Sequence, residues 1–143
     1  TIQSDLFEKT SANLKSDIKI IEKVGYGLVD LIEKGNVESE DIDFLLKKYL
    51  NPMMEKNIDA LVLGCTHYPY LIPSIRKIIT NDIKIIDAGF AVAKQTKKIL
   101  AKFKISQTKE NCNTTHKFYS NKDTKVLSRL LNNNCVEILN KEF

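Results

Sequence analysis

The chain has 143 residues, 43% hydrophobic and 28% charged, which is typical of a globular protein with one moderate core or parts of two smaller ones. No apolar run approaches the roughly 18 residues that a membrane-spanning helix needs, and no signal-peptide pattern opens the sequence, so no membrane association is expected. The net charge of +4 comes from lysines spread along amphipathic segments, without a dense basic block, which argues against nucleic acid as a partner. The three cysteines show no paired spacing, which argues against a disulfide framework and favours a reducing cytoplasm. The chain begins with Thr1 instead of Met, which suggests a fragment.

The first part of the chain predicts two helices separated by a strand and a glycine turn. Residues 1–14 are a predicted helix, and the apolar positions within residues 17–24 predict a strand. The Gly-Tyr-Gly sequence at 25–27 breaks the pattern and allows a turn. A short helix is predicted over residues 28–34, and Gly35 ends it.

A long helix is predicted after Ser39, which is a favourable N-cap followed by three acidic residues that complement the helix dipole. Apolar residues repeat at helical spacing for several turns after this cap: Ile42, Leu45, Leu46, Tyr49, Leu50 and Met53. Pro52 is expected to kink or divide this helix.

Strands and helices alternate through the rest of the chain. Residues 59–63 and 82–87 are predicted strands, and helices are predicted over residues 70–80 and 90–103. After a polar loop at 104–114, three further elements are expected: a strand at 117–119, a helix opened by a capping box of Ser120 and Asp123, and a strand at 135–139. This alternation predicts an α/β fold with mostly parallel strands.

Two reactive side chains, Cys65 and His67, stand in the turn after the strand at 59–63. A strand that runs into a helix across a tight turn places that turn at the carboxyl edge of a sheet, where α/β proteins have their sites. A thiol at the start of a helix and beside an imidazole is favoured as a thiolate, which can act as a nucleophile or as a base towards carbon. Thr66 can offer its hydroxyl and N–H to a substrate carboxylate at the same helix terminus.

Two other interpretations of these residues remain open. A cysteine at the end of a strand is often a small apolar filler, and a nearby histidine often only satisfies a carbonyl. A metal site built from Cys65, His67, Cys112 and His116 is a further alternative, although the spacing matches no familiar zinc pattern.

Residues 63–69, Leu-Gly-Cys-Thr-His-Tyr-Pro, resemble the second cysteine motif of the bacterial glutamate racemases, which belong to the aspartate/glutamate racemase superfamily. The resemblance extends along nearly the whole chain. Residues 1–4 resemble the Thr-x-x-Ser opening of that family's second domain, and residues 31–35 resemble its Leu-Val-Glu stretch. Residues 86–89 resemble its Ile-Asp-Ser-Gly turn, and residues 118–119 its late strand.

The resemblance implies a cofactor-independent enzyme that interconverts L- and D-glutamate and supplies D-glutamate for peptidoglycan, in a cytoplasmic homodimer with two α/β domains facing the substrate. It implies that Cys65 is one of two catalytic acid/base cysteines. Thr66 and His67 are then expected to contact the substrate, and His67 also to tune the thiol. Glu33 matches a carboxylate proposed to assist catalysis, although it is equally well explained as a solvated residue near a helix end.

The chain departs from the family in two respects. The family's first half, which carries the opposing cysteine, has no counterpart here, and neither Cys112 nor Cys135 has the sequence context to replace it. Many members have Ala-Cys-Pro where residues 24–26 read Val-Gly-Tyr. We therefore expect residues 1–89 to form the second racemase domain and residues 90–143 to complete the first, and we expect the chain alone to be inactive.

Two alternative functions remain open at the level of sequence. The first is an aspartate racemase of the same superfamily, because one sequence does not fix the preferred length of the substrate side chain. The second is a binding or regulatory module that keeps the fold without the chemistry.

Overall fold

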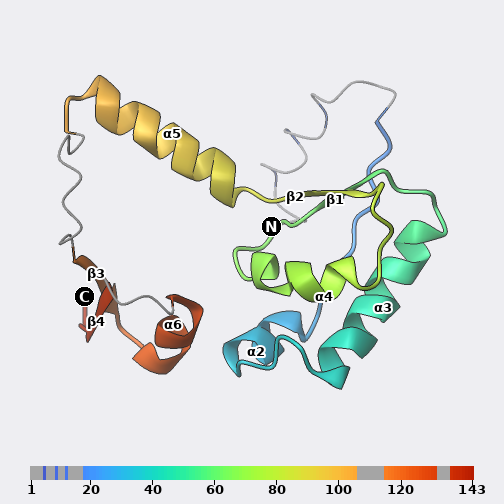
Figure 1. Cartoon of the computed structure of the whole chain (residues 1–143), viewed down its shortest axis with the longest axis horizontal. Coiled ribbons are helices and arrows are strands. Elements are labelled where there is room, and N and C mark those ends of the chain that lie inside the picture. Colours follow the sequence, from blue (N-terminus) through green and yellow to red (C-terminus); the bar gives the residue numbers. More distant parts are fainter. Residues whose placement is uncertain (1–4, 6–8, 10–11, 13–17, 106–114, 132–135) are drawn as a thin grey trace. The chain divides into compact units, whose positions relative to one another are not determined.

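The computed structural model describes residues 5, 9, 12, 18–105, 115–131 and 136–143 (Figure 1). The chain divides into two compact units. The first unit comprises Thr1–Ile32 and Asn36–Phe90, and the second comprises Glu33–Gly35 and Ala91–Phe143. Most of the helix predicted over residues 1–14 lies outside the described residues.

The first unit is built around a parallel β-α-β arrangement. Strands β1 (Ala60–Val62) and β2 (Lys84–Ile86) pair in parallel, with Leu61 opposite Ile85. The 3-10 helix η1 (Tyr68–Leu71) and the helix α4 (Ile72–Arg76) connect them, so the chain returns to the same sheet in the same direction. Beyond the strands, the Leu63 amide donates a hydrogen bond of 2.8 Å to the Ile86 carbonyl, which holds the two strand ends together.

Two further helices contribute to this unit: α2 (Leu28–Glu33) and α3 (Glu40–Met54). The prediction for α3 is confirmed at its start, because Ser39 is the N-cap and its side chain accepts a hydrogen bond from the Ile42 amide at 3.4 Å. The expectation that Pro52 divides α3 is wrong, since the helix continues to Met54. Pro52 cannot donate to the Lys48 carbonyl, but the helix ends two residues later, at Met54, so the proline interrupts it only near its end.

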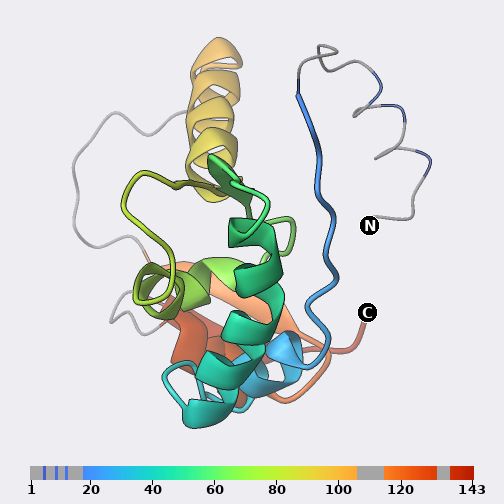
Figure 2. The same ribbon diagram turned by 90° about the vertical axis from the view of Figure 1, so that its right-hand side faces the viewer.

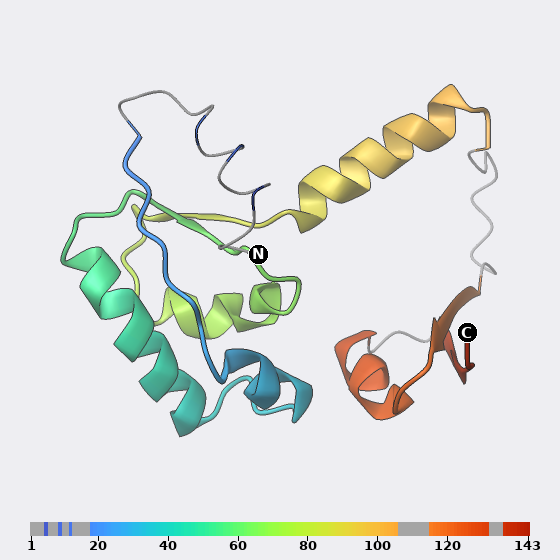
Figure 3. The same ribbon diagram turned by 180° about the vertical axis from the view of Figure 1, so that it is seen from behind.

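The core of the first unit lies between these helices and the sheet (Figure 3). It consists of apolar side chains from the helices, from β1 and from the connecting loops: Leu28, Ile32, Ile42, Leu46, Tyr49, Leu50, Leu61, Leu63, Leu71, Ile75, Ile79 and Ile83. The hydroxyl of Ser74, only 1% exposed, donates to the Val37 carbonyl at 3.0 Å. This hydrogen bond satisfies a buried polar group and ties α4 to the loop before α3.

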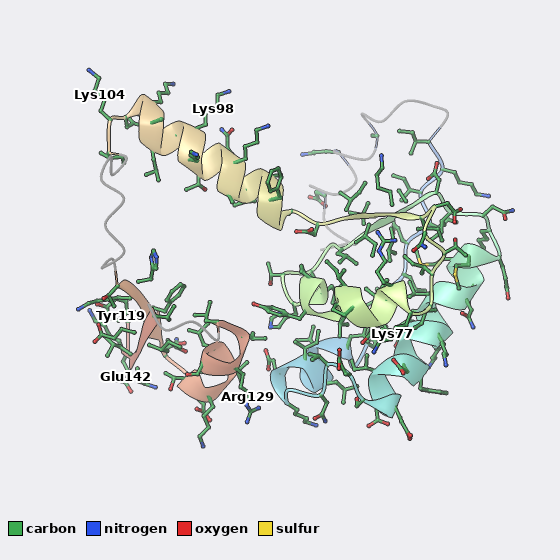
Figure 4. All side chains as sticks on the ribbon, viewed as in Figure 1. Lys77, Lys98, Lys104, Tyr119, Arg129 and Glu142 are labelled. Carbon is green, nitrogen blue, oxygen red and sulfur yellow. The ribbon has the colours of Figure 1, made fainter. Side chains whose placement is uncertain are left out.

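The second unit contains a second parallel β-α-β arrangement and one long helix. Strands β3 (His116–Ser120) and β4 (Val136–Asn140) pair in parallel, and α6 (Thr124–Leu131) lies between them in sequence. The helix α5 (Gly89–Lys102) precedes them, and the side chains of Lys98 and Lys104 project from it and from the loop after it (Figure 4). Neither α5 nor α6 contains a buried residue.

The structure confirms the predicted α/β class with parallel strands, but it corrects the strand predicted over residues 17–24. Residues 18–24 run as a chain without regular secondary structure (Figure 2), and Ile18, Ile20 and Val24 are exposed. The apolar pattern was compatible with a strand, but a strand also needs a backbone partner. Among the described residues, β1 and β2 pair with each other instead.

Two helix boundaries also differ from prediction. The helical segment after the Cys-Thr-His turn covers residues 68–76 and begins as a 3-10 turn, with a proline near the start of both η1 and α4. The predicted capping box at Ser120 is wrong, because α6 begins at Thr124. Asp123 takes the capping role, and its Oδ1 accepts from the Lys125 amide at 2.9 Å. Within the described part of the chain, no helix combines the length and apolar character needed to cross a bilayer.

Candidate active site

The candidate site lies in the turn that follows β1. Parallel pairing brings the carboxyl ends of β1 and β2 to the same edge of the sheet, so Cys65 and Asp87 follow neighbouring strand ends. The Asp87 carboxylate is engaged in its own turn, where Oδ1 accepts from the Gly89 amide at 2.8 Å. The structure therefore places the Cys-Thr-His turn at the carboxyl edge of a parallel sheet, as the sequence predicted.

The structure brings two of the predicted residues together. The Sγ atom of Cys65 lies 3.9 Å from Nδ1 of His67, and both side chains are half-buried. At this distance, the imidazole can accept the thiol proton or donate to the thiolate, depending on its tautomer. The pair can therefore exchange a proton while the sulfur stays reachable from solvent.

The helix terminus contributes less than the sequence suggested. Helix η1 has four residues and α4 has five, and no side chain caps either one. A helix dipole grows with the number of aligned peptide units, so these short segments provide a weak field at Cys65. The imidazole of His67 is the polar partner that the structure places beside the thiol.

Tyr68 is a site residue that the sequence-based prediction missed. Its amide donates to the Cys65 carbonyl at 3.1 Å and so closes the turn, while its phenol donates to the Gly25 carbonyl at 3.3 Å. Partial burial raises the pKa of the Tyr68 phenol, and the charge of Cys65 raises it further. The phenol therefore keeps its proton to a higher pH than an ordinary tyrosine. Its position inside the heptapeptide of residues 63–69 was the available signal.

The two other predicted site residues, Thr66 and Glu33, are both exposed. Thr66 is exposed in the turn between Cys65 and His67. Glu33 is the exposed last residue of α2 and belongs to the short stretch Glu33–Gly35, which groups with the second unit. The roles assigned to Thr66 and Glu33 remain predictions.

The metal alternative joins Cys65 and His67 to Cys112 and His116. Cys112 and Cys135 lie outside the described residues, and His116 is the first residue of β3 in the second unit. Among the residues that the structure covers, no group of three or more His, Cys, Asp and Glu side chains is arranged to hold a metal ion.

The fold and the site together define a class: an α/β protein with a thiol–imidazole pair at the carboxyl edge of a parallel sheet. No protein-family model matches the sequence. The glutamate racemase of Ralstonia nicotianae is 45% identical over 101 residues, which are 71% of this chain and 36% of that protein.

Two solved structures extend the comparison. Glutamate racemase from Francisella tularensis, crystallised in complex with D-glutamate, aligns with a TM-score of 0.64 and 33% identity over 78% of this chain and 42% of its own. Glutamate racemase isoform RacE1 from Bacillus anthracis aligns with a TM-score of 0.77 and 27% identity over 99% of this chain and 53% of its own. The chain is thus a homologue of the glutamate racemases, and it matches the carboxyl-terminal half of the proteins in that superfamily. It spans about a third to a half of the length of the curated relatives that it matches.

Proposed function

We propose that this chain is the carboxyl-terminal half of a cofactor-independent glutamate racemase, and that Cys65 is one of its two acid/base groups. The observation that carries the proposal is the 3.9 Å contact between Cys65 Sγ and His67 Nδ1 in the turn after β1. The homology to glutamate racemases supports the same reaction. The complex of the Francisella tularensis enzyme with D-glutamate supports glutamate as the substrate.

The reaction requires two bases on opposite faces of the substrate α-carbon. One base removes the α-proton, and the conjugate acid of the other returns a proton to the opposite face, which inverts the centre. In one direction the Cys65 thiolate takes the proton, and in the other the Cys65 thiol gives it back. The opposing group must come from the half of the enzyme that this chain does not match.

The neighbouring residues have supporting roles in this proposal. His67 stabilises the charged form of the sulfur, and Thr66 offers its hydroxyl and N–H to a substrate carboxylate. Glu33 assists from α2 as a carboxylate. In the whole enzyme we propose a cytoplasmic homodimer whose product enters peptidoglycan synthesis and so supports the cell wall and cell shape.

A chimera tests the proposal directly. This chain replaces the carboxyl-terminal half of the Ralstonia nicotianae racemase, and turnover is measured with L-glutamate and L-aspartate by chiral chromatography. We expect the chimera to racemise glutamate and the isolated chain to racemise neither amino acid. Turnover of aspartate in preference to glutamate would favour the aspartate racemase alternative, and full turnover by the isolated chain would refute the proposed half-enzyme.

A folded chimera with no activity on either substrate would favour the non-catalytic module. The circular dichroism spectrum and thermal transition of the chimera, compared with those of the Ralstonia nicotianae enzyme, establish whether it is folded.

A further inference from the structure

Two tyrosines donate to consecutive carbonyls of the glycine turn at residues 25–27. Tyr49, from α3, donates from its hydroxyl to the Tyr26 carbonyl at 2.8 Å. Tyr68, from η1, donates to the Gly25 carbonyl at 3.3 Å. The two bonds fix the same short turn from two separate elements of the first unit.

The two tyrosines differ in what else they touch. The Tyr68 amide donates to the Cys65 carbonyl, and the charge of Cys65 acts on the Tyr68 phenol, whereas Tyr49 belongs to α3 and its hydroxyl donates to the Tyr26 carbonyl. Tyr68 therefore holds the turn of Cys65 and His67 at one end and the glycine turn at the other.

The Tyr68 phenol packs closely against the backbone of Gly25. A Cβ atom at Gly25 would lie 2.7 Å from the Tyr68 hydroxyl oxygen and 2.6 Å from Cδ1 of Leu28. Both distances are shorter than real Cβ contacts, so a side chain at this position would push aside the phenol of Tyr68 or the side chain of Leu28. The glycine therefore leaves the phenol its place at the Gly25 carbonyl.

We propose that Tyr68 is a positioning residue of the thiol site, which holds Cys65 against His67 by anchoring their turn to the Gly25 carbonyl. Without the anchor, the turn samples geometries in which the sulfur and the imidazole separate, and the thiolate loses its partner. This inference rests on the proposed function and deepens it, but it concerns the reactivity of Cys65, which is measured first without turnover.

The test compares two matched variants of this chain, Tyr68→Phe and Tyr49→Phe. Each removes one phenolic oxygen and one bond to the glycine turn, and only the first removes the anchor of the Cys65 turn. Iodoacetamide alkylation is followed at each cysteine by peptide mass spectrometry from about pH 6 to pH 10, with Cys112 as the internal reference. The titratable groups that act on the Tyr68 phenol are Cys65 and Tyr49.

We expect Tyr68→Phe to slow the alkylation of Cys65 at neutral pH on the order of three- to tenfold relative to Cys112, because the sulfur is no longer held beside the His67 imidazole. Tyr49→Phe is expected to leave the ratio of Cys65 to Cys112 unchanged. Gly25→Ala, which displaces the phenol but keeps it, is expected to reproduce the effect of Tyr68→Phe. Equal effects of the two tyrosine variants, or an unchanged profile in Tyr68→Phe, would overturn the positioning role.

The racemase chimera separates this inference from the proposed function. In that protein, Tyr68→Phe is expected to lower kcat by roughly tenfold with little change in KM, since a small misplacement of a reacting group slows the chemical step. Full activity in Tyr68→Phe together with loss of activity in Cys65→Ser would refute the anchor and leave the proposed function standing. Full activity in Cys65→Ser would instead refute the proposed function.

Discussion

The two units of the chain contain similar elements but differ in what they bury. Every fully buried apolar side chain in the described part of the chain belongs to the first unit, whereas α5 and α6 of the second unit have none. Both units have parallel strands and amphipathic helices. The difference shows that an amphipathic pattern specifies a helix, while burial also requires a partner surface.

Helix α5 makes this point most clearly. Its apolar residues include Val92 and Leu100, and Phe103 lies just beyond its last residue, yet Val92 is 61% and Phe103 64% exposed. The helix is long and regular all the same. We therefore expect the first unit to provide most of the stability of this chain and the second unit to be marginal.

The same Leu→Ala substitution made in each unit tests that expectation, and it gives the largest expected change in the free energy of unfolding. Leu46 in α3 is 3% exposed and Leu100 in α5 is 36% exposed. Leu46→Ala removes buried methyl groups and leaves a cavity, so we expect it to lower the free energy of unfolding by about 2–5 kcal/mol. Leu100→Ala is expected to change it by about 0.5 kcal/mol or less.

Urea unfolding followed by circular dichroism measures both changes. Leu46→Ile, which keeps the side-chain volume, serves as the control and is expected to cost less than about 1.5 kcal/mol. Similar losses for Leu46→Ala and Leu100→Ala would show that the second unit has a core of its own and would break the comparison.

The two observed helix caps give a smaller, second test. Ser39 caps α3 in the first unit and Asp123 caps α6 in the second. Each substitution to Ala removes one bond to a backbone amide, worth roughly 1 kcal/mol to its helix. We expect Ser39→Ala to lower the main thermal transition and Asp123→Ala to leave it in place while increasing amide hydrogen exchange in α6. A shift of the main transition by Asp123→Ala would indicate that both units unfold together.

The smallest expected effect is a contribution of Tyr68 to the pH dependence of the stability against unfolding. Burial, and then the charge of Cys65, raise the pKa of this phenol above its unfolded value of about 10. The folded state therefore retains the proton longer than the unfolded state. The resulting stabilisation is fully present below about pH 10 and is lost as the pH rises through the folded pKa.

Thermal midpoints of the unaltered chain and of Tyr68→Phe at about pH 8 and pH 10.5 measure this pH-dependent stabilisation. We expect the unaltered chain to lose more stability than Tyr68→Phe between these pH values, by a small amount because the phenol is only partly buried. Parallel curves for the two proteins would show that Tyr68 titrates as in the unfolded chain.

The sequence was sufficient for features that depend on local chemistry. Ser39 with its acidic first turn located α3, Gly35 located the end of α2, and the Cys-Thr-His turn was expected at a sheet edge where it is found. Gly27 and Gly35 have positive φ angles of 82° and 85°, as their places in turns suggested.

Features that depend on distant partners were not predictable. Residues 18–24 have a strand-like pattern, but no partner strand pairs with them among the described residues. The role of Tyr68 depends on the carbonyl of Gly25, 43 positions earlier, and nothing in the local pattern of either residue indicates that bond. The identity of α6's cap depended on where the helix begins, one residue after Asp123.

The most direct test of Cys65 as an acid/base group is exchange of the glutamate α-proton in D2O, followed by NMR in the racemase chimera. A group that removes the α-proton must exchange it with solvent, so the account predicts deuterium incorporation during turnover. It also predicts that Cys65→Ser lowers racemisation, and the exchange of the enantiomer that Cys65 deprotonates, by at least about a hundredfold, whereas Cys135→Ser retains both. Undiminished racemisation in Cys65→Ser would contradict the account.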